Sequence, residues 1–262
     1  MERVPDAIGE DLQKQPLSAA REILADAKYV AVFSGAGLSA ESGIATFRDT
    51  ETDALWSRFD PMELASVTGF ESHPERVIDW YCWRRNKVAK AQPNPAHLAL
   101  ARQPGLIHVT QNVDDLSERA GADEQSILHV HGKLTKDRCH AACGYEETID
   151  LQHAPALRRC PKCHSLMRPS VVWFEEALPA DVWSRAVAVC QRTDCLVVVG
   201  TSATVYPAAG LIETVHANRG RIIVINTHIS KGSHLASVEL IGPAGDIVPQ
   251  LFYGIELNPD LQ

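Results

Sequence analysis

The sequence predicts an α/β fold, a Rossmann-like parallel sheet with helices on both faces plus a smaller lobe. Two observations lead to this prediction. Short β-rich runs alternate with helical patterns through much of the chain, and two stretches interrupt that alternation. Strands that alternate with helices are typical of parallel, doubly wound sheets. Such sheets bind ligands at the carboxyl ends of their strands, so polar residues at those ends are candidate site residues.

The predicted elements follow in chain order. Apolar residues between Leu17 and Ala27 recur at helical spacing and predict an amphipathic helix near the N-terminus. Short apolar runs predict buried strands at Tyr29–Phe33, Leu106–Thr110, Ile127–Val130, Cys195–Val199, Arg221–Ile225 and Ser237–Ile241. Amphipathic runs between several of these strands predict helices at Asp114–Ala120, Ala180–Gln191 and Pro207–His216.

Two stretches are expected to leave the sheet and form the smaller lobe. Residues 49–103 have a helical pattern, and residues 133–168 contain four of the seven cysteines and little apolar periodicity. We therefore expect an N-terminal extension over residues 1–15 and a catalytic domain over residues 16–262. Its large lobe would comprise residues 16–48, 104–132 and 169–262, and a ligand cleft would lie between the lobes.

Composition excludes several function classes. The chain has 262 residues and a formal net charge of −8, which disfavours nucleic acid as the main partner because phosphate binding depends on a positive surface. Its apolar runs are too short to span a membrane, and the charged first 16 residues do not resemble a secretory signal. Seven cysteines without such a signal favour a reducing compartment, so we expect a cytoplasmic protein.

Four cysteines have the spacing of a metal site. Cys139 and Cys143 form one close pair, Cys160 and Cys163 form another, and 16 residues separate the pairs. Four thiolates in this pattern can surround one structural zinc ion tetrahedrally. His140 and His164 are nearby ligand types that could replace a thiolate. We interpret the other three cysteines as core residues.

A glycine-rich turn follows the first predicted strand. The segment Ser34–Gly43 contains Gly35 and Gly37, and glycines at such a turn let backbone N–H groups approach a phosphate. Arg48 lies just downstream and could neutralise phosphate charge. A Gly-x-Gly pattern alone is weak evidence, because any tight strand-to-helix turn can use it, and the usual third glycine is missing.

Polar residues gather at the ends of four other predicted strands. The segment Thr110–Asp114 ends one strand, and His129 and His131 lie at the end of the next. Spacing alone does not choose between these two histidines, because residues two apart face the same side of a strand. Gly200–Ser202 and the pair Asn226 and Thr227 end two further strands. This ring of small polar groups suits a sugar-phosphate ligand.

Together these motifs resemble the sirtuins, which are NAD-dependent protein lysine deacylases. The resemblance extends from about Ser18 to Phe252. It is carried by the glycine loop through Phe47 and Arg48, by Thr110–Asp114, and by His131 with Gly132, which selects His131 over His129. The segment Arg168–Phe174 resembles the family's acyl-peptide-binding segment, and Gly200–Ser202, Asn226–Thr227 and Gly242–Gly245 resemble its remaining NAD contacts.

The resemblance implies a role for each matched residue. Gly35, Ala36, Gly37, Ser39 and Arg48 would hold the NAD phosphates, and Phe47 would shield the reacting ribose. Gln111 and Asn112 would position that ribose, and Asp114 would bind the nicotinamide carboxamide. The remaining NAD contacts would be Gly200, Thr201, Ser202, Asn226, Thr227 and Ala244. His131 would be the general base, and Val172 and Phe174 would bind the acylated peptide. The products would be nicotinamide, O-acyl-ADP-ribose and free lysine.

The chain departs from the family pattern at four places. Ala45 replaces a usual Pro, Ser117 replaces a usual His, and Glu175 replaces a usual Gly. The first cysteine pair has three intervening residues where two are usual. Because Glu175 lies in the segment that docks the peptide, the alternatives of mono-ADP-ribosyl transfer and NAD hydrolysis stay open, as does a non-catalytic role in NAD sensing.

One further pair predicts which acyl group is removed. Tyr81 and Arg84 are three residues apart on a predicted helix and therefore share one face. A guanidinium binds a carboxylate through two hydrogen bonds, and a phenol can add a third. The pair resembles the one that marks class III sirtuins, which favour succinyl, malonyl or glutaryl lysine. Without that resemblance, an exposed helix with solvated arginines would be the simpler interpretation.

Overall fold

The computed structural model describes residues 7–44 and 60–258. Its largest unit is a six-stranded sheet with the order β3-β2-β1-β7-β8-β9, in which every neighbouring pair is parallel. The strands are β1 Val30–Ser34, β2 Ile107–Thr110, β3 Ile127–His129, β7 Cys195–Val199, β8 Arg221–Asn226 and β9 Val238–Ile241. Each lies within two residues of a predicted strand, so the predicted α/β class with a parallel sheet is confirmed.

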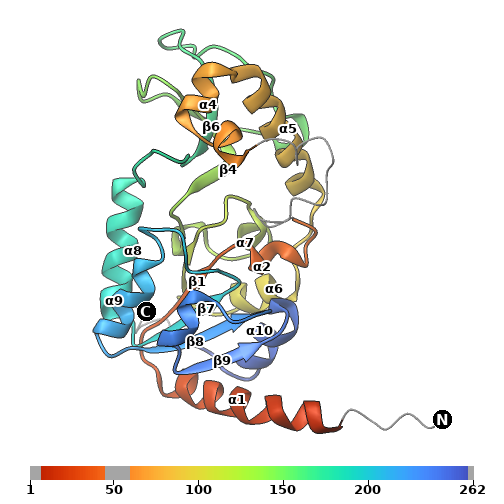
Figure 1. The fold of residues 1–262 in the computed structure, drawn as a ribbon, viewed down its shortest axis with the longest axis vertical. Helices are drawn as coiled ribbons and strands as arrows, with labels where there is room; N and C mark the ends of the chain where they lie inside the picture. Colours follow the sequence, from red (N-terminus) through yellow and green to blue (C-terminus); the bar gives the residue numbers. More distant parts are fainter. Residues whose placement is uncertain (1–6, 45–59, 259–262) are drawn as a thin grey trace, which may run out of the picture.

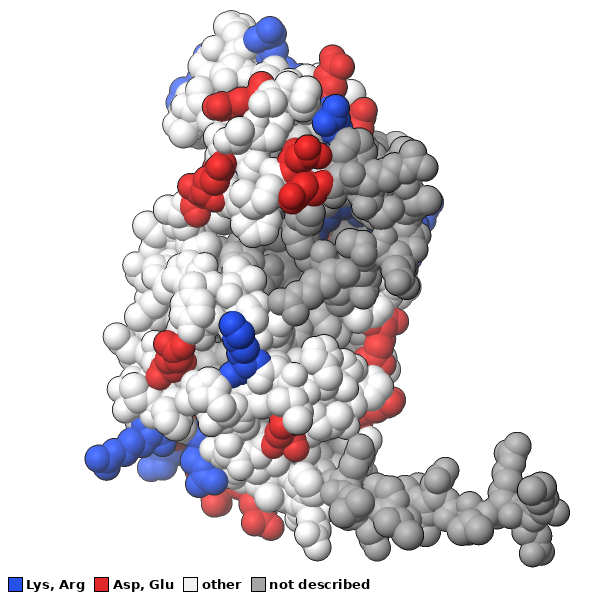
Figure 2. All heavy atoms as spheres, in the orientation of Figure 1, with Lys and Arg blue, Asp and Glu red and all other residues white. Residues whose placement is uncertain are grey.

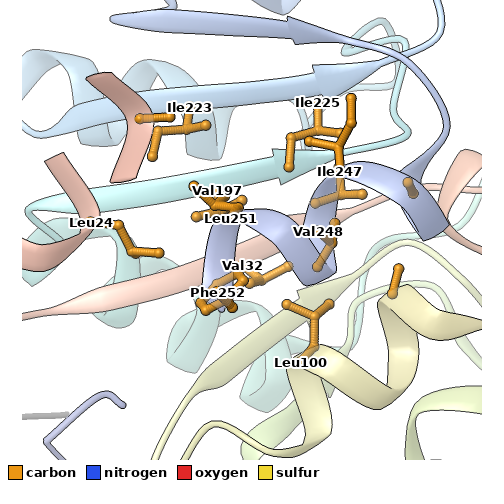
Figure 3. Close-up of a cluster of buried hydrophobic side chains, with 14 of the residues drawn as sticks. Leu24, Val32, Leu100, Val197, Ile223, Ile225, Ile247, Val248, Leu251 and Phe252 are labelled. Carbon is orange, nitrogen blue, oxygen red and sulfur yellow. The ribbon is translucent and has the colours of Figure 1, made fainter. Parts of the chain in front are cut away.

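Helices cover both faces of this sheet (Figure 1). On one face lie α1 Ala7–Asp26, α6 Pro95–Ala101 and α10 Ala244–Phe252, and on the other lie α8 Ala180–Arg192 and α9 Gly210–Ala217. The side chains of β1 alternate between the two cores, since Val32 lies in the first and Ala31 and Phe33 lie in the second. Figure 3 shows the first core, with Val32, Val197 and Ile223 of the sheet facing Leu24 of α1 and Leu251 of α10.

A second lobe is built around a three-stranded antiparallel sheet with the order β5-β4-β6. Its strands are β4 Gly132–Cys139, β5 Glu146–Thr148 and β6 Met167–Val171, and its helices are α3 Pro61–Leu64, α4 Val67–Ser72 and α5 Pro74–Lys90. The helices and sheet share a core that contains Phe70, Tyr81, Leu134 and Trp173. In Figure 1 this lobe lies at the top of the molecule, above the parallel sheet.

The structure corrects both expected lobe boundaries. Helix α6 lies within the predicted helical insertion, yet its Ala96 and Leu100 are buried in the core of the large sheet. Residues 169–171 of strand β6 were expected in the large lobe, yet the whole of β6 pairs with β4 in the small lobe. Both errors have one cause. Apolar periodicity shows that a segment is buried, but it does not show which of the two hydrophobic cores the segment packs against.

The remaining short elements lie mostly in connections. They are α2 Gly37–Ala40, α7 Leu116–Arg119, η1 Glu124–Ser126, η2 Leu151–His153 and η3 Lys231–Leu235. Figure 2 shows acidic and basic side chains interspersed over one face of the molecule. Among the residues that the structure describes, no helix is long and apolar enough to cross a membrane.

Candidate active site and metal centre

The predicted glycine turn brings the ends of β1 and β7 into backbone contact. The N–H of Gly37 donates to the carbonyl of Gly200 at 2.8 Å, and the N–H of Gly35 donates to the carbonyl of Val199 at 3.0 Å. A Cβ added to Gly37 would lie 2.6 Å from Cα of Gly200, and Gly200 itself has a φ of +60°. Only glycines allow this approach. It places the strand ends that carry the candidate site residues at one edge of the sheet.

Residues from three strand ends are hydrogen-bonded to one another there. Nε2 of Gln111, after β2, donates to Oγ1 of Thr201 at 2.9 Å, and Nδ2 of Asn226, at the end of β8, donates to the carbonyl of Thr201 at 3.0 Å. The N–H of Thr227 donates to Oδ1 of Asn226 at 3.0 Å. The structure therefore brings these predicted strand-end residues together, with Ser202 beside them.

A second cluster surrounds Ser39 of α2. Its hydroxyl donates to Oδ2 of Asp114 at 3.1 Å and accepts from Nδ2 of Asn112 at 3.0 Å. Burial raises the pKa of the Asp114 carboxyl, against the effect of its hydrogen bonds from Leu116 and Ser39. Ser39 and two residues 73 and 75 positions later in the sequence, Asn112 and Asp114, thus form one polar group, which suits recognition of an amide and a ribose hydroxyl.

Two residues of this site were missed by the sequence analysis. His97 caps α6 together with Asn94, and its Nε2 lies 3.4 Å from Oγ of Ser39. Burial lowers the pKa of His97 to about 4, so the ring is neutral near pH 7. Glu41 accepts the N–H of Gly245 at 2.6 Å, next to Ala244 at the start of α10. Glu41 lies within the glycine motif, and the Asn94-to-His97 cap spacing was the only sequence signal for His97.

The two candidate histidines differ in their partners. Nδ1 of His131 lies 3.2 Å from the carbonyl oxygen of Gln111, which can only accept, so Nδ1 carries the proton. Nε2 has no hydrogen-bond partner within the described ranges and is left as a basic nitrogen. Burial lowers the pKa of His131, which favours this neutral form. His129 instead has acceptors at both nitrogens, Asn112 and Glu118, so its geometry does not offer a base.

The expected peptide segment leads away from His131. The N–H of Val172 donates to the carbonyl of His131 at 2.9 Å, and the N–H of Phe174 donates to the carbonyl of Ala65 at 2.9 Å. Phe174 is 42% exposed. Glu175 has a φ of +76°, a conformation that glycine adopts more readily, and its carboxylate accepts from the hydroxyl of Thr68. Residues 172–174 follow the end of β6, and Phe174 forms an isolated parallel bridge with Ser66.

Tyr81 and Arg84 lie on one face of α5, as expected. Tyr81 is 1% exposed, and its hydroxyl accepts from Nε1 of Trp173 at 2.8 Å, which leaves the phenolic proton to donate. The guanidinium of Arg84 is half-buried and lies 4.8 Å from the Trp80 ring centre and 5.5 Å from that of Tyr81. In the described part of the chain, no carboxylate pairs with Arg84. Tyr81 therefore packs inward, as the simpler interpretation also expects, whereas Arg84 is partly exposed and lies against aromatic rings.

The four predicted metal ligands converge. Sγ of Cys139, Cys143, Cys160 and Cys163 all lie within 4.8 Å of one another, with the shortest separations at 3.3 and 3.6 Å. Zn–S bonds of about 2.3 Å in a tetrahedron require sulfurs about 3.8 Å apart, so the cluster fits one structural zinc. The extra residue of the first pair is accommodated by Ala142, whose φ is +52°.

Comparison with known proteins identifies the family. A model of the Sir2 family matches residues 35–207. The chain belongs to the Sir2 family. It is 45% identical over 232 residues to NAD-dependent protein deacylase 1 of Archaeoglobus fulgidus, a match that covers 87% of this chain and 93% of that protein. The resemblance to the sirtuins inferred from the motifs is thereby confirmed.

Solved structures of Sir2 homologues have the same fold. A Sir2 homologue in complex with NAD has a TM-score of 0.83 and 44% identity, over 89% of this chain and 91% of that chain. A mutant Sir2 homologue in complex with 2′-O-acetyl ADP ribose has a TM-score of 0.82 and 41% identity, over 92% of this chain and 99% of that chain. These matches support NAD as the cofactor of this Sir2-family site.

Three of the four departures from the family pattern can be placed in the structure, the cysteine-pair spacing at Ala142 among them, and one cannot. Ser117 lies on α7, with its hydroxyl 3.4 Å from Nδ1 of His108, and Glu175 takes the strained backbone described above. Ala45 and the predicted NAD contacts Phe47 and Arg48 lie outside the described residues, so their expected roles stay predictions.

We predict that replacing one zinc ligand removes the metal and destabilises the small lobe. In Cys160→Ser, zinc content should fall from about one ion per chain to nearly none, because site formation and folding are coupled. Metal analysis and thermal unfolding measure both effects. The control is Cys82→Ser, since Sγ of Cys82 donates only to the backbone carbonyls of Pro155 at 3.4 Å and Ala154 at 3.9 Å. Unchanged zinc in Cys160→Ser, or equal loss in the control, contradicts the assignment.

Proposed function

We propose that this Sir2-family protein is an NAD-dependent protein lysine deacylase that prefers succinyl, malonyl or glutaryl lysine over acetyl lysine. The observation that carries the preference is Arg84, a half-buried guanidinium beside Tyr81 without a carboxylate partner among the described residues. The deacylase activity is the one named for its relatives, and the acyl preference rests on this chain's own side chains.

The residues at the strand ends fit NAD. The glycine turn with Ala36 and Ser39 would face the phosphates, since close-packed glycines expose backbone N–H groups. Gln111, Asn112 and Asp114 would hold the ribose and the carboxamide, and the remaining contacts would be Gly200, Thr201, Ser202, Asn226, Thr227 and Ala244. When bound, NAD would supply an electrophilic ribose carbon, at which the acyl oxygen would replace nicotinamide as the leaving group.

His131 is proposed as the general base. Nδ1–H of His131 donates to the carbonyl oxygen of Gln111. Nε2 is therefore the nitrogen that would accept a proton from a ribose hydroxyl. Val172 and Phe174 would hold the peptide strand, because Val172 is hydrogen-bonded directly to His131 and Phe174 lies two residues further on. This arrangement supports a position of the acylated lysine beside the base.

The acyl preference follows from charge. A carboxylate on the acyl chain would gain a two-pronged hydrogen bond from Arg84 and a third from the Tyr81 hydroxyl. An acetyl group offers no carboxylate, so the guanidinium would gain no partner from it. Hydrogen bonds to charged groups contribute about 1.5–3 kcal/mol, which corresponds to a preference of at least about tenfold.

We predict that His131→Ala lowers deacylation by about 10²–10⁴-fold, the usual contribution of a general base. NAD affinity should change little, because Nε2 of His131 makes no contact that holds the site together. Initial rates and calorimetric titration of NAD measure the two quantities. A variant that keeps wild-type turnover, or one that fails to bind NAD, contradicts the role.

The pH dependence of the rate provides a separate prediction. Protonated His131 cannot accept a proton, and burial lowers its pKa below the ordinary 6.5. The base form therefore persists to lower pH than for an exposed histidine. We expect the acidic limb of the kcat/KM profile, which reports the free enzyme, to have its midpoint below pH 6.5, measured between about pH 5 and 8. A midpoint at or above that value argues against His131 as the base.

We predict that Arg84→Met lowers kcat/KM for a succinylated peptide by about 10–100-fold and changes that for the acetylated peptide by less than about threefold. The matched control is Lys87→Met, which removes another cation from α5, one that lies 5.6 Å from the Trp83 ring. Competition between the two peptides in one reaction, followed by mass spectrometry, gives the ratio directly. Equal slowing of both peptides, or a wild type that prefers acetyl, overturns the preference.

The strained Glu175 in the peptide segment is the one observation that favours the alternative of ADP-ribosyl transfer or NAD hydrolysis. The products distinguish these reactions from deacylation. Deacylation yields O-acyl-ADP-ribose and free lysine in equal amounts, whereas hydrolysis yields free ADP-ribose without an acylated peptide. Separating the products by mass spectrometry tests the proposed activity before any acyl preference is measured.

A further inference from the structure

A buried ion-paired histidine lies beneath the candidate site. His129, the last residue of β3, has Nδ1 at 2.8 Å from the carbonyl oxygen of Asn112 and Nε2 at 2.9 Å from Oε1 of Glu118 on α7. Its side chain is 4% exposed. A carbonyl oxygen only accepts hydrogen bonds, so Nδ1 must carry a proton to donate.

The second acceptor is a carboxylate. Oε1 of Glu118 also accepts from Nζ of Lys133 at 2.9 Å, and Oε2 is buried without a hydrogen-bond partner among the residues described. Burial alone would raise the pKa of Glu118, but the hydrogen bonds and charges of His129 and Lys133 outweigh it and lower the pKa to about 2. A carboxylate has no proton to donate, so Nε2 of His129 must carry one as well.

Both contacts therefore require the imidazolium form of His129. A neutral ring has only one N–H, and its unprotonated nitrogen would face an oxygen lone pair of either Asn112 or Glu118. The other groups that face this pair are Lys133, the carboxyl of Asp114 and His108, whose pKa burial lowers to about 3. Lys133 is thus the second cation on Glu118, and His108 adds no charge near pH 7.

The contact with Asn112 matters because it fixes that residue's backbone. The N–H of Asn112 donates to Oγ1 of Thr110 at 3.0 Å and its carbonyl accepts from His129, so the peptide groups on both sides are held. The side-chain amide then points to Ser39, at 3.0 Å. Without the hydrogen bond from His129, the backbone carbonyl of Asn112 would be free to move, although every side chain that lines the site would remain.

We propose that His129, held as an imidazolium by Glu118, is a positioning residue that fixes Asn112 for the reaction. The proposal rests on the proposed function, in which Asn112 positions the ribose. His129 touches neither ribose nor acyl-lysine in this scheme. Replacing His129 is therefore expected to lower kcat more than it changes KM. A misplaced Asn112 amide raises the activation barrier, because the reacting atoms must be aligned in the transition state.

The test combines kinetics with direct observation of the ring protons. His129→Gln can donate to Asn112 or to Glu118 but not to both, and Glu118→Gln removes the negative charge that holds the imidazolium. We expect each variant to lower kcat by about 10–100-fold, the value of one charge-assisted hydrogen bond, while KM for NAD changes by less than about threefold. His153→Gln is the control, since Nδ1 of His153 pairs with Asp150 at 2.7 Å but the side chain is 80% exposed and remote from the site. Its kcat should not change.

Protonation is read in the wild type by NMR of ¹⁵N-labelled histidine at pH 7, so the result does not depend on whether a variant folds. Two ring N–H signals, assigned to His129 in the wild type by through-bond correlation to its own backbone, support the proposal, and a neutral ring overturns it. Rates normalised to folded protein that stay within twofold of wild type in His129→Gln also overturn it. If the wild type has no deacylase activity, the proposed function fails, and the NMR result still decides whether the imidazolium exists.

Discussion

The contact between two glycine turns, Gly35–Gly37 after β1 and Gly200 after β7, is the constraint on which the site depends. A Cβ at Gly37 or Gly200 would lie within 2.6 Å of opposing backbone atoms. Because these turns meet, the ends of β1, β2, β7 and β8 converge, and Gln111 can reach Thr201 at 2.9 Å. A larger residue at Gly37 would separate β1 from β7 and move the polar groups apart. Glycine is therefore required at this position for the strand ends to meet.

His131 occupies the point where the chain passes from one sheet to the other. The N–H of the preceding Val130 donates to Thr110 of the parallel sheet, and the carbonyl of His131 accepts from Val172, next to the small sheet. Gly132, with a φ of +77° and Ser170 packed closely against it, makes the turn between them. Gln111 of the large lobe therefore fixes the Nδ1 proton of His131, and Val172, beside the small sheet, fixes its backbone carbonyl.

The sequence was sufficient for features that local pattern determines and insufficient for those that depend on distant partners. All six parallel strands were predicted, because buried strands of a parallel sheet are short continuous apolar runs, and the zinc cysteines were predicted from spacing. The lobe assignments of α6 and β6 were wrong, since apolar periodicity does not specify which core a segment joins. His97 and Glu41 were missed because their partners, Ser39 and Gly245, are 58 and 204 residues away in sequence.

Three histidines near the strand ends show that hydrogen-bond partners decide which protonation form an imidazole takes. His108 is as buried as a core residue and accepts or donates only among neutral hydroxyls, so desolvation dominates and lowers its pKa to about 3. His131 has one carbonyl acceptor and remains a neutral ring with a basic Nε2. His129 is equally buried but has a carbonyl at one nitrogen and an ionised carboxylate at the other, so it needs both protons. Strand spacing did not distinguish His129 from His131, but their partners do. The single acceptor Gln111 leaves His131 a neutral base, and the second acceptor Glu118 makes His129 a cation.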